Sequence, residues 1–224
     1  MAGDAPSTTA TKKKRTAPTK EAPQPAKKHK TDFCDEIAVM FADHVFRVPS
    51  VRLRSRSTLA TRETRSGWLS IPNKNLLGAD TFSTFLQIIY TDKVVLNEPD
   101  EATETFQTYT KLIDLYCLCE VLQDPTSMNL TISKLANTNI GVPNHITMKT
   151  LVRQVYNMTE SGSKLREYIV DSAASRWTIP SFIMFHQEFK NDLLLRLQAM
   201  RGELGDYEEI RLRVNIPENY FVPA

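Results

Sequence analysis

Glycine and cysteine are both scarce in this chain of 224 residues, which contains seven glycines and three cysteines. Loops that cradle phosphate groups depend on closely spaced glycines, and neither GxGxxG nor GxxxxGK[ST] is present. The hydrolase pattern GxSxG and the zinc-protease pattern HExxH are missing as well. We therefore expect no catalytic residue, no metal site and no cofactor.

The cysteines cannot form a disulfide framework, because the chain has only Cys34, Cys117 and Cys119. Cys117 and Cys119 lie two residues apart in a predicted helix, so about 200° separates them and they cannot both face one metal ion. A free cysteine behaves as a small apolar residue, which favours core packing for both. Cys34 with His44 is the one candidate nucleophile pair, and no third group is suggested to orient it.

Long apolar runs are also missing from the chain. A membrane-spanning helix needs about 20 predominantly apolar residues, and a secretory signal needs an apolar core near the N-terminus. The sequence meets neither requirement. We expect a soluble intracellular chain with reduced thiols and no membrane partner.

Residues 1–31 contain no Val, Leu, Ile, Phe, Trp or Tyr, and we call them the basic arm. Such a segment cannot bury enough apolar surface to offset the chain entropy lost on folding, so we predict disorder. Its eight Lys or Arg residues against Asp4 and Glu21 give a charge of +6. The whole chain carries +2, which leaves about −4 for the remainder. A basic arm thus precedes a slightly acidic body.

Two clusters of basic residues in the arm are similar to a bipartite nuclear import signal, which binds acidic grooves of an import receptor. A solubilising arm and direct contact with nucleic acid are the alternatives. Non-specific phosphate binding would depend strongly on salt, and no aromatic residue is interleaved to stack on bases. We therefore expect a nuclear protein and no nucleic-acid partner, with the import signal formed by Lys12, Lys13, Lys14, Arg15, Lys27, Lys28 and Lys30.

The first part of the body has the pattern of short strands. The runs 36–41 and 44–48 are rich in β-branched and aromatic residues and predict a tight hairpin. Pro49 favours a helix over 51–56, because proline is tolerated in a first helical turn. A polar loop over 61–67 and a third strand over 68–71 follow. Strands first and helices later indicate an α+β fold.

Ala79 to Val94 predicts a short amphipathic helix followed by a Tyr-Thr-Asp-Lys turn. Asp80 is a candidate N-cap, and Val94–Leu96 is a candidate edge strand. Four large apolar side chains have the i, i+3, i+4, i+7 spacing that places them on one face: Phe82, Phe85, Leu86 and Ile89.

Helical patterns dominate the rest of the chain. The run 105–122 is apolar nearly all round, which predicts a buried helix, and Asp124-Pro125 ends it. A break over 139–144 separates a helix with one apolar face at Met128, Ile132 and Leu135 from three further helices. The last residues, 210–216, alternate apolar and polar side chains and predict an extra strand.

Four stretches in this order resemble the BTB/POZ domain family, in particular fungal-type members in which helices follow the domain. They are Val45–Ser57, Ser70–Val94, Leu112–Leu135 and Leu151–Ala174. The resemblance implies a BTB/POZ fold over 32–137, with a small, mainly antiparallel sheet flanked by helices. A helical extension over 145–203 and a C-terminal tail or extra strand over 204–224 would follow.

One part of the family pattern differs. Pro49-Ser50 replaces the basic pair that the family usually carries after the second strand, whereas Asp35 matches its acidic residue. In the family these positions line a charged pocket that some members use for corepressors. Arg52 is the candidate substitute for the missing basic residue.

The resemblance implies a non-enzymatic protein–protein interaction module. Family dimers bury the first strand and first helix, which here makes the candidate homodimer interface Val39, Phe41, Val51 and Leu53. A second route is docking as a substrate adaptor on a cullin-type ubiquitin ligase scaffold, for which the candidate docking loop contains Leu59, Arg62 and Glu63. A nuclear protein that associates with DNA through its basic arm is the third alternative.

Overall fold

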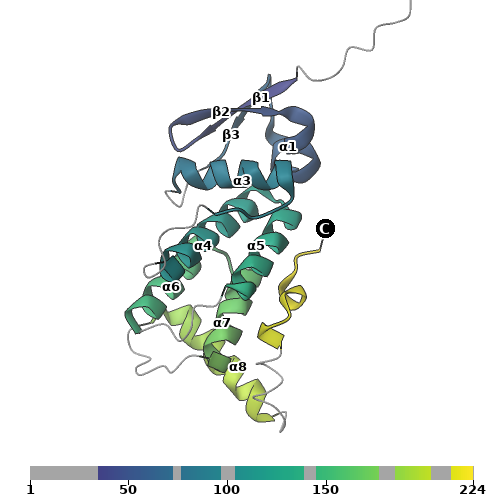
Figure 1. Ribbon diagram of the computed structural model, residues 1–224. Helices are drawn as coiled ribbons and strands as arrows, with labels where there is room; N and C mark the ends of the chain where they lie inside the picture. The colour runs from purple at the N-terminus through teal and green to yellow at the C-terminus, as the bar shows by residue number, and fades with distance from the viewer. Residues whose placement is uncertain are drawn as a thin grey trace, which may run out of the picture. The chain divides into compact units, whose positions relative to one another are not determined.

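In the computed structural model, residues 35–72, 77–96, 104–138, 145–176, 185–202 and 213–223 are described. Residues 33–224 form one compact unit. The strands lie in the first part of the chain and helices dominate the later part, which agrees with the predicted α+β class (Figure 1). The elements are β1 (Glu36–Phe41), β2 (His44–Pro49), α1 (Ser50–Arg56), α2 (Thr58–Glu63), β3 (Trp68–Ser70), α3 (Ala79–Thr91), α4 (Glu104–Leu122), α5 (Pro125–Asn137), α6 (His145–Met158), α7 (Lys164–Arg176), α8 (Gln187–Gly202) and the 3-10 helix η2 (Pro217–Tyr220).

The three strands form one sheet in the order β2-β1-β3. The β1–β2 hairpin is antiparallel, as predicted, and its register runs from Glu36↔Pro49 to Phe41↔His44. β3 pairs with β1 in the parallel direction. The sheet is therefore mixed, and its longer pairing is the antiparallel one. A parallel neighbour requires a crossover connection, which α1 and α2 provide.

One face of the sheet is buried against α3, which runs beneath it in Figure 1. Side chains alternate between the two faces of a strand, so every second residue of β1 faces the core. The ring of Phe82 on α3 lies 5.5 Å from that of Phe41 and 4.6 Å from that of Phe46. These aromatic contacts hold the sheet on the helix.

The chain after β2 is more helical than predicted. Ser57 interrupts α1 and begins α2, since its Oγ accepts a hydrogen bond from the Ala60 N–H at 3.0 Å. The predicted loop over 61–67 is therefore wrong at its start, because α2 continues to Glu63. A serine N-cap supports even a short helix when one side of it is buried, as it is here at Leu59 and Ala60.

Helix α3 is amphipathic as predicted, but its buried face differs slightly. Phe82, Phe85 and Ile89 are buried, whereas Ile88 replaces Leu86 as the fourth buried residue. Gly78, not Asp80, is the N-cap, and the helix makes no side-chain cap hydrogen bond. The predicted edge strand over Val94–Leu96 is also wrong, since these residues have no regular secondary structure.

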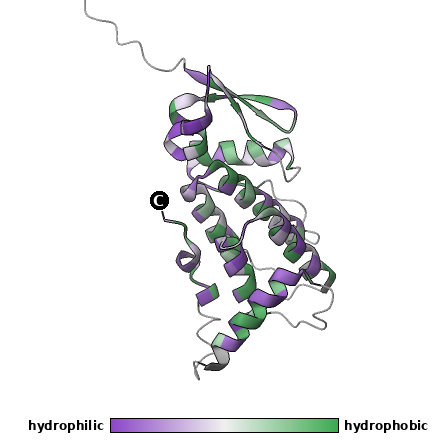
Figure 2. Ribbon diagram, turned by 180° about the vertical axis from the view of Figure 1, so that it is seen from behind, coloured by the Kyte–Doolittle hydropathy of each residue, from purple (hydrophilic) through white to green (hydrophobic). Residues whose placement is uncertain are grey.

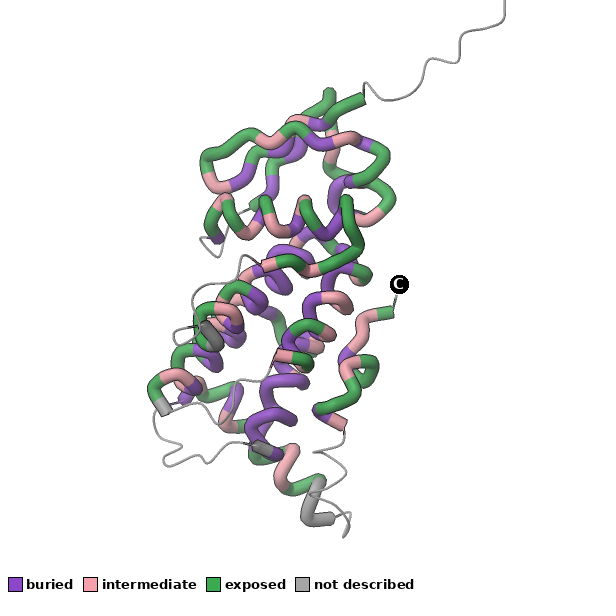
Figure 3. The backbone as a smooth tube through the Cα atoms, in the orientation of Figure 1, coloured by how far each residue is buried: buried purple, intermediate pink, exposed green. Residues whose placement is uncertain are grey.

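Helices α4 and α5 form the buried centre of the unit (Figure 3). Figure 2 shows hydrophobic residues recurring along the helices of this unit. The predicted end of α4 is confirmed: Asp124 caps α5 by accepting from the Ser127 N–H at 2.9 Å, and Pro125 occupies the first turn. Core packing of Cys117 and Cys119 is confirmed as well, since both are buried.

The C-terminal segment 213–223 is not a strand. The prediction of a strand over 210–216 is wrong for its described residues, because Val214 belongs to a helical turn and η2 follows. Tyr220 is buried and its ring meets that of Tyr168 edge-on at 5.3 Å. Asn129 of α5 accepts from the Val222 N–H at 2.7 Å and donates to its carbonyl at 3.0 Å. Side-chain contacts with α5 and α7 therefore replace strand pairing.

Candidate partner-binding surface

The face of the sheet that points away from α3 carries a row of four residues from neighbouring strands. Strand register places Ala38 beside Arg47 on β2 and beside Trp68 on β3. Arg65 forms an antiparallel bridge with Trp68. Residues paired in this way share one face of a sheet. The row therefore reads Arg65, Trp68, Ala38 and Arg47, with an aromatic ring and a small residue between two arginines.

A second row, next to the first, is mainly apolar. Met40 of β1 pairs with Val45 of β2 and with Ser70 of β3. We call the two rows together the outer sheet face, which consists of Ala38, Met40, Val45, Arg47, Arg65, Trp68 and Ser70.

The outer sheet face is open to solvent. Met40, Val45 and Trp68 are exposed by 46%, 57% and 55%, so each strand contributes one exposed large apolar side chain. The side chain of Arg47 is exposed by 79% and lies 3.8 Å from Glu36. In Figure 1 the helices lie on the other side of the sheet and along its edge. Clustered exposed apolar residues with a polar rim are typical of interaction sites.

A tight return of the chain positions Arg65 against Trp68. Ser66 and Gly67 both have positive φ, 50° and 79°, and reverse the direction of the backbone. Two backbone hydrogen bonds close the return: Arg65 N–H to the Trp68 carbonyl at 3.1 Å, and Trp68 N–H to the Arg65 carbonyl at 2.9 Å. Sequence reasoning missed this site, although the loop residues and the short strand were both recognised.

The candidate homodimer interface is largely inside the protein. Val39, Phe41 and Leu53 are exposed by 1% or less, and they belong to the core. Val51, on α1, is exposed by 64% and does not belong to the buried core. The structure narrows the predicted set to Val51, since the other three already contact the interior of their own chain.

The candidate docking loop is part of helix α2. Leu59 is buried, whereas Arg62 and Glu63 are exposed and bind each other at 2.8 Å. The candidate dimer interface and the candidate docking loop therefore each contain both buried and exposed residues. The import residues from Lys12 to Lys30, and also Cys34, lie outside the described residues.

Asp35, which matches the family's acidic residue, does not pair with Arg52, the candidate substitute for the missing basic residue. The Asp35 carboxylate accepts a hydrogen bond from the Ser50 hydroxyl at 2.9 Å, and the Asp35 carbonyl accepts from the Ser50 N–H at 2.8 Å. Arg52 is exposed and forms no ion pair with any described residue. Asp35 therefore secures the start of α1.

Metal binding, reactive cysteines and membrane-spanning helices are further possibilities for the described residues. No group of three His, Cys, Asp or Glu side chains there could hold a metal ion. Burial raises the pKa of the Cys117 and Cys119 thiols well above the ordinary value, which keeps them protonated and unreactive. No helix among the described residues is long and apolar enough to cross a membrane.

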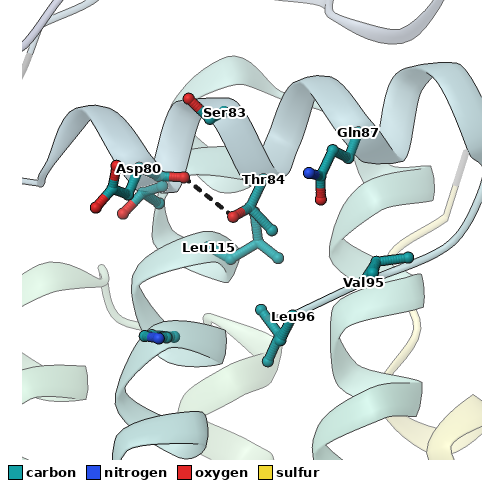
Figure 4. Close-up of a pocket in the computed structure, with 9 residues that line it drawn as sticks. Asp80, Ser83, Thr84, Gln87, Val95, Leu96 and Leu115 are labelled. Atoms are coloured by element: carbon teal, nitrogen blue, oxygen red, sulfur yellow. Dashed lines mark hydrogen bonds between the residues drawn. The ribbon is translucent and has the colours of Figure 1, made fainter. Parts of the chain in front are cut away.

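A small cleft of about 270 Å³ lies between α3, α4 and the segment after α3 (Figure 4). Two of its hydroxyl groups already form hydrogen bonds inside α3. Thr84 donates to the Asp80 carbonyl at 3.0 Å, and Ser83 donates to the Ala79 carbonyl at 3.2 Å. Val95 and Leu96 add apolar surface. The arrangement has no feature that points to a ligand.

The chain was compared with family models, with curated proteins and with solved structures, and none of them matches it.

Proposed function

We propose that this chain is a non-enzymatic protein–protein interaction module of the BTB/POZ type, which self-associates and acts as a nuclear adaptor or regulatory protein. The order of its elements supports the fold part of this proposal. A hairpin, two short helices, a third strand, an amphipathic helix and a helix pair follow one another from β1 to α5. The four stretches that resemble the family fall on these elements and on α6 and α7.

The outer sheet face is the observation that carries the functional part. Four of its larger side chains are of types that are enriched at protein contacts, namely tryptophan, methionine and arginine, and it contains no lysine, which is depleted there. Trp68 is paired with the small Ala38 on one side and with Arg65 on the other, and it remains 55% exposed. Tryptophans and arginines in such positions carry much of the binding energy of interfaces.

A second copy of the chain is the partner that we propose for this face. In a two-fold contact the same patch lies on both sides, so the patch must complement itself. The outer sheet face has an apolar centre, and its rim carries both charges, in Arg47 and Glu36. These two side chains are exposed and only 3.8 Å apart, so they can exchange partners across a two-fold interface.

Light scattering over a micromolar concentration range tests this proposal. The unmodified chain is expected to form a dimer. Trp68→Ser is expected to weaken dimerisation about 30-fold or more, since hot-spot truncations cost about 2 kcal/mol or more. Ile146→Ser is the matched control, because Ile146 is also a large apolar residue and is 69% exposed on α6.

A third variant, Val51→Ser, separates this face from the α1 interface that the resemblance implies. Loss of the dimer in Val51→Ser with retention in Trp68→Ser would assign the contact to α1. A monomer at all concentrations would refute self-association altogether.

A further inference from the structure

A groove of about 780 Å³ lies at the C-terminal end of α4. This volume is in the range of ligand-binding sites. The groove is bounded by the end of α4, the start of α5, the turn between α6 and α7, and the last described residues of the chain. None of the residues of the outer sheet face contributes to it. Its lining residues include Tyr116, Glu120, Met128, Met158, Ser163 and Val222.

Two buried hydroxyl groups in this groove have no hydrogen-bond partner. Tyr116 is fully buried, Ser163 is 7% exposed, and neither Tyr116 Oη nor Ser163 Oγ has a partner. Both lie near the Glu120 carboxylate: burial and then the Glu120 charge raise the pKa of Tyr116, and the Ser163 side chain acts in the lowering direction on the pKa of Tyr116 and of Glu120. A buried polar group without a partner costs about 1 to 3 kcal/mol, so a ligand that bonds to these groups would gain that energy.

The charges that face the groove favour a cation. Glu120 and Glu160 both line it, and the pKa of Glu120 is raised by burial and, to a smaller extent, by the charge of Glu160. Lys164 also lines it, but its ammonium group is held by both carboxylate oxygens of Glu167 at 2.9 Å. Arg166, which faces Glu120 from α7, donates instead to Thr159, Glu188 and the Tyr156 carbonyl.

The walls of the groove are apolar. Met128 and Met158 are flexible side chains that adapt to the shape of a bound group, and Val121 and Val222 extend the apolar surface. A carboxylate and two hydroxyls therefore lie within apolar walls. This combination matches a long side chain that has an apolar stem and a cationic end.

We propose that this groove binds an arginine or lysine side chain of a segment of a partner protein. The cationic end pairs with Glu120 and donates to the hydroxyl oxygens of Tyr116 and Ser163, while the stem packs on Met128 and Met158. Arginine fits best, because its guanidinium group can donate to several acceptors at once. This site extends the proposed interaction function with a second surface.

Nuclear magnetic resonance titration of the full chain tests the proposal. The probes are N-acetyl-arginine methylamide, its lysine counterpart and, as a neutral control, N-acetyl-norleucine methylamide. The arginine and lysine probes are expected to shift the amide signals of the turn over 159–164, and the norleucine probe to leave them unchanged. Equal shifts with norleucine, or no shift with either cation, would overturn the proposal.

Variants then test the assigned residues. Glu120→Gln is expected to weaken binding of the arginine probe about tenfold or more, because hydrogen bonds to charged groups contribute about 1.5 to 3 kcal/mol. Tyr116→Phe is expected to weaken it less. Glu218→Gln, at an exposed position on η2, is the matched control. Unchanged affinity in Glu120→Gln, with a native amide spectrum, would refute the assignment whether or not the chain dimerises.

Discussion

At the scale of single residues, Asp171 ties the end of the chain to the helices. Its side chain is fully buried and accepts from the Tyr220 hydroxyl at 2.8 Å and from Arg196 at 3.1 Å. Arg213 lies 3.5 Å away. A buried charge is stable only when it is paired and hydrogen-bonded, so α7 needs partners from both α8 and the C-terminal segment.

Removal of one of these partners should destabilise the protein. Tyr220→Phe is expected to lower the free energy of unfolding by about 1 to 3 kcal/mol, because it leaves the buried Asp171 carboxylate short of a donor. Tyr90→Phe makes the same chemical change at a position that is 49% exposed, and should have little effect. Urea unfolding measures both, and equal losses in the two variants would contradict this role of Asp171.

Glu120 has the opposite effect on stability. Burial raises the pKa of its carboxyl group, with a further upward contribution from Glu160 and a downward one from Ser163 and Arg166. A carboxyl group whose pKa is higher in the folded state destabilises that state once the pH exceeds its ordinary pKa, and fully so above the raised pKa. Such a cost is typical of a group that is kept for binding.

The variant Glu120→Gln is therefore expected to be more stable than the unmodified chain at pH 7. The difference in free energy of unfolding should vanish at low pH. It should grow as the pH rises from the ordinary carboxyl pKa through the raised one, and then remain constant. Urea unfolding between pH 3 and pH 8 measures this, and Glu218→Gln serves as the control. A difference that is independent of pH would show that burial of the charge is not its cause.

At the scale of elements, the β1–β2 turn has a backbone shape that its residues do not favour. Ala42 and Asp43 both have positive φ, 49° and 61°, as a two-residue hairpin turn of type I′ requires. The alternating runs on either side were sufficient to predict the hairpin. The turn itself lacks the Asn-Gly or Asp-Gly pair that is typical of type I′ turns. An alanine in the left-handed region costs about 1 kcal/mol.

Ala42→Asn is expected to raise the free energy of unfolding by about 0.5 to 1 kcal/mol, because asparagine tolerates a positive φ. Ala136→Asn, in the last turn of α5, is the control: Ala136 is partly buried against the core and has φ < 0, so the same change should destabilise by a few tenths of a kcal/mol or more. Thermal unfolding of the two variants measures the effects. Destabilisation in both would contradict the assigned turn type.

Local sequence patterns predicted the end of one helix correctly but failed for the C-terminal segment. Asp124-Pro125 predicted the end of α4 correctly, because proline disfavours the helical conformation of the residue before it, an effect of immediate neighbours in the chain. The alternating residues over 210–216 predicted a strand. The described part of this segment, residues 213–216, does not pair with any described strand. Arg213 and Tyr220 contact Asp171 instead, and these contacts decide its conformation.

At the scale of the whole molecule, the charge is unevenly divided between the basic arm and the compact unit. The arm carries +6, and the remainder carries about −4. A signal in a segment without large apolar residues can be read by a receptor without unfolding of the compact unit.

Fluorescence microscopy of the tagged chain tests the predicted nuclear localisation. The unmodified chain is expected in the nucleus, and replacement of Lys27, Lys28 and Lys30 by alanine should shift it to the cytoplasm. Replacement of Lys20 alone is the control, since it lies outside both clusters. Unchanged nuclear signal after replacement of both clusters would contradict the import prediction.

The sequence by itself determined the α+β class, the hairpin, the amphipathic character of α3 and the burial of Cys117 and Cys119. These features depend on residue type and on spacing within a few turns or strands. Only the tertiary structure decided which apolar residues remain exposed. Val39 and Val45 are equivalent as residue types, yet one is buried and the other is 57% exposed. Strand register and the placement of α3 make that difference and align Arg65, Trp68, Ala38 and Arg47, because residues distant in the chain meet only after folding.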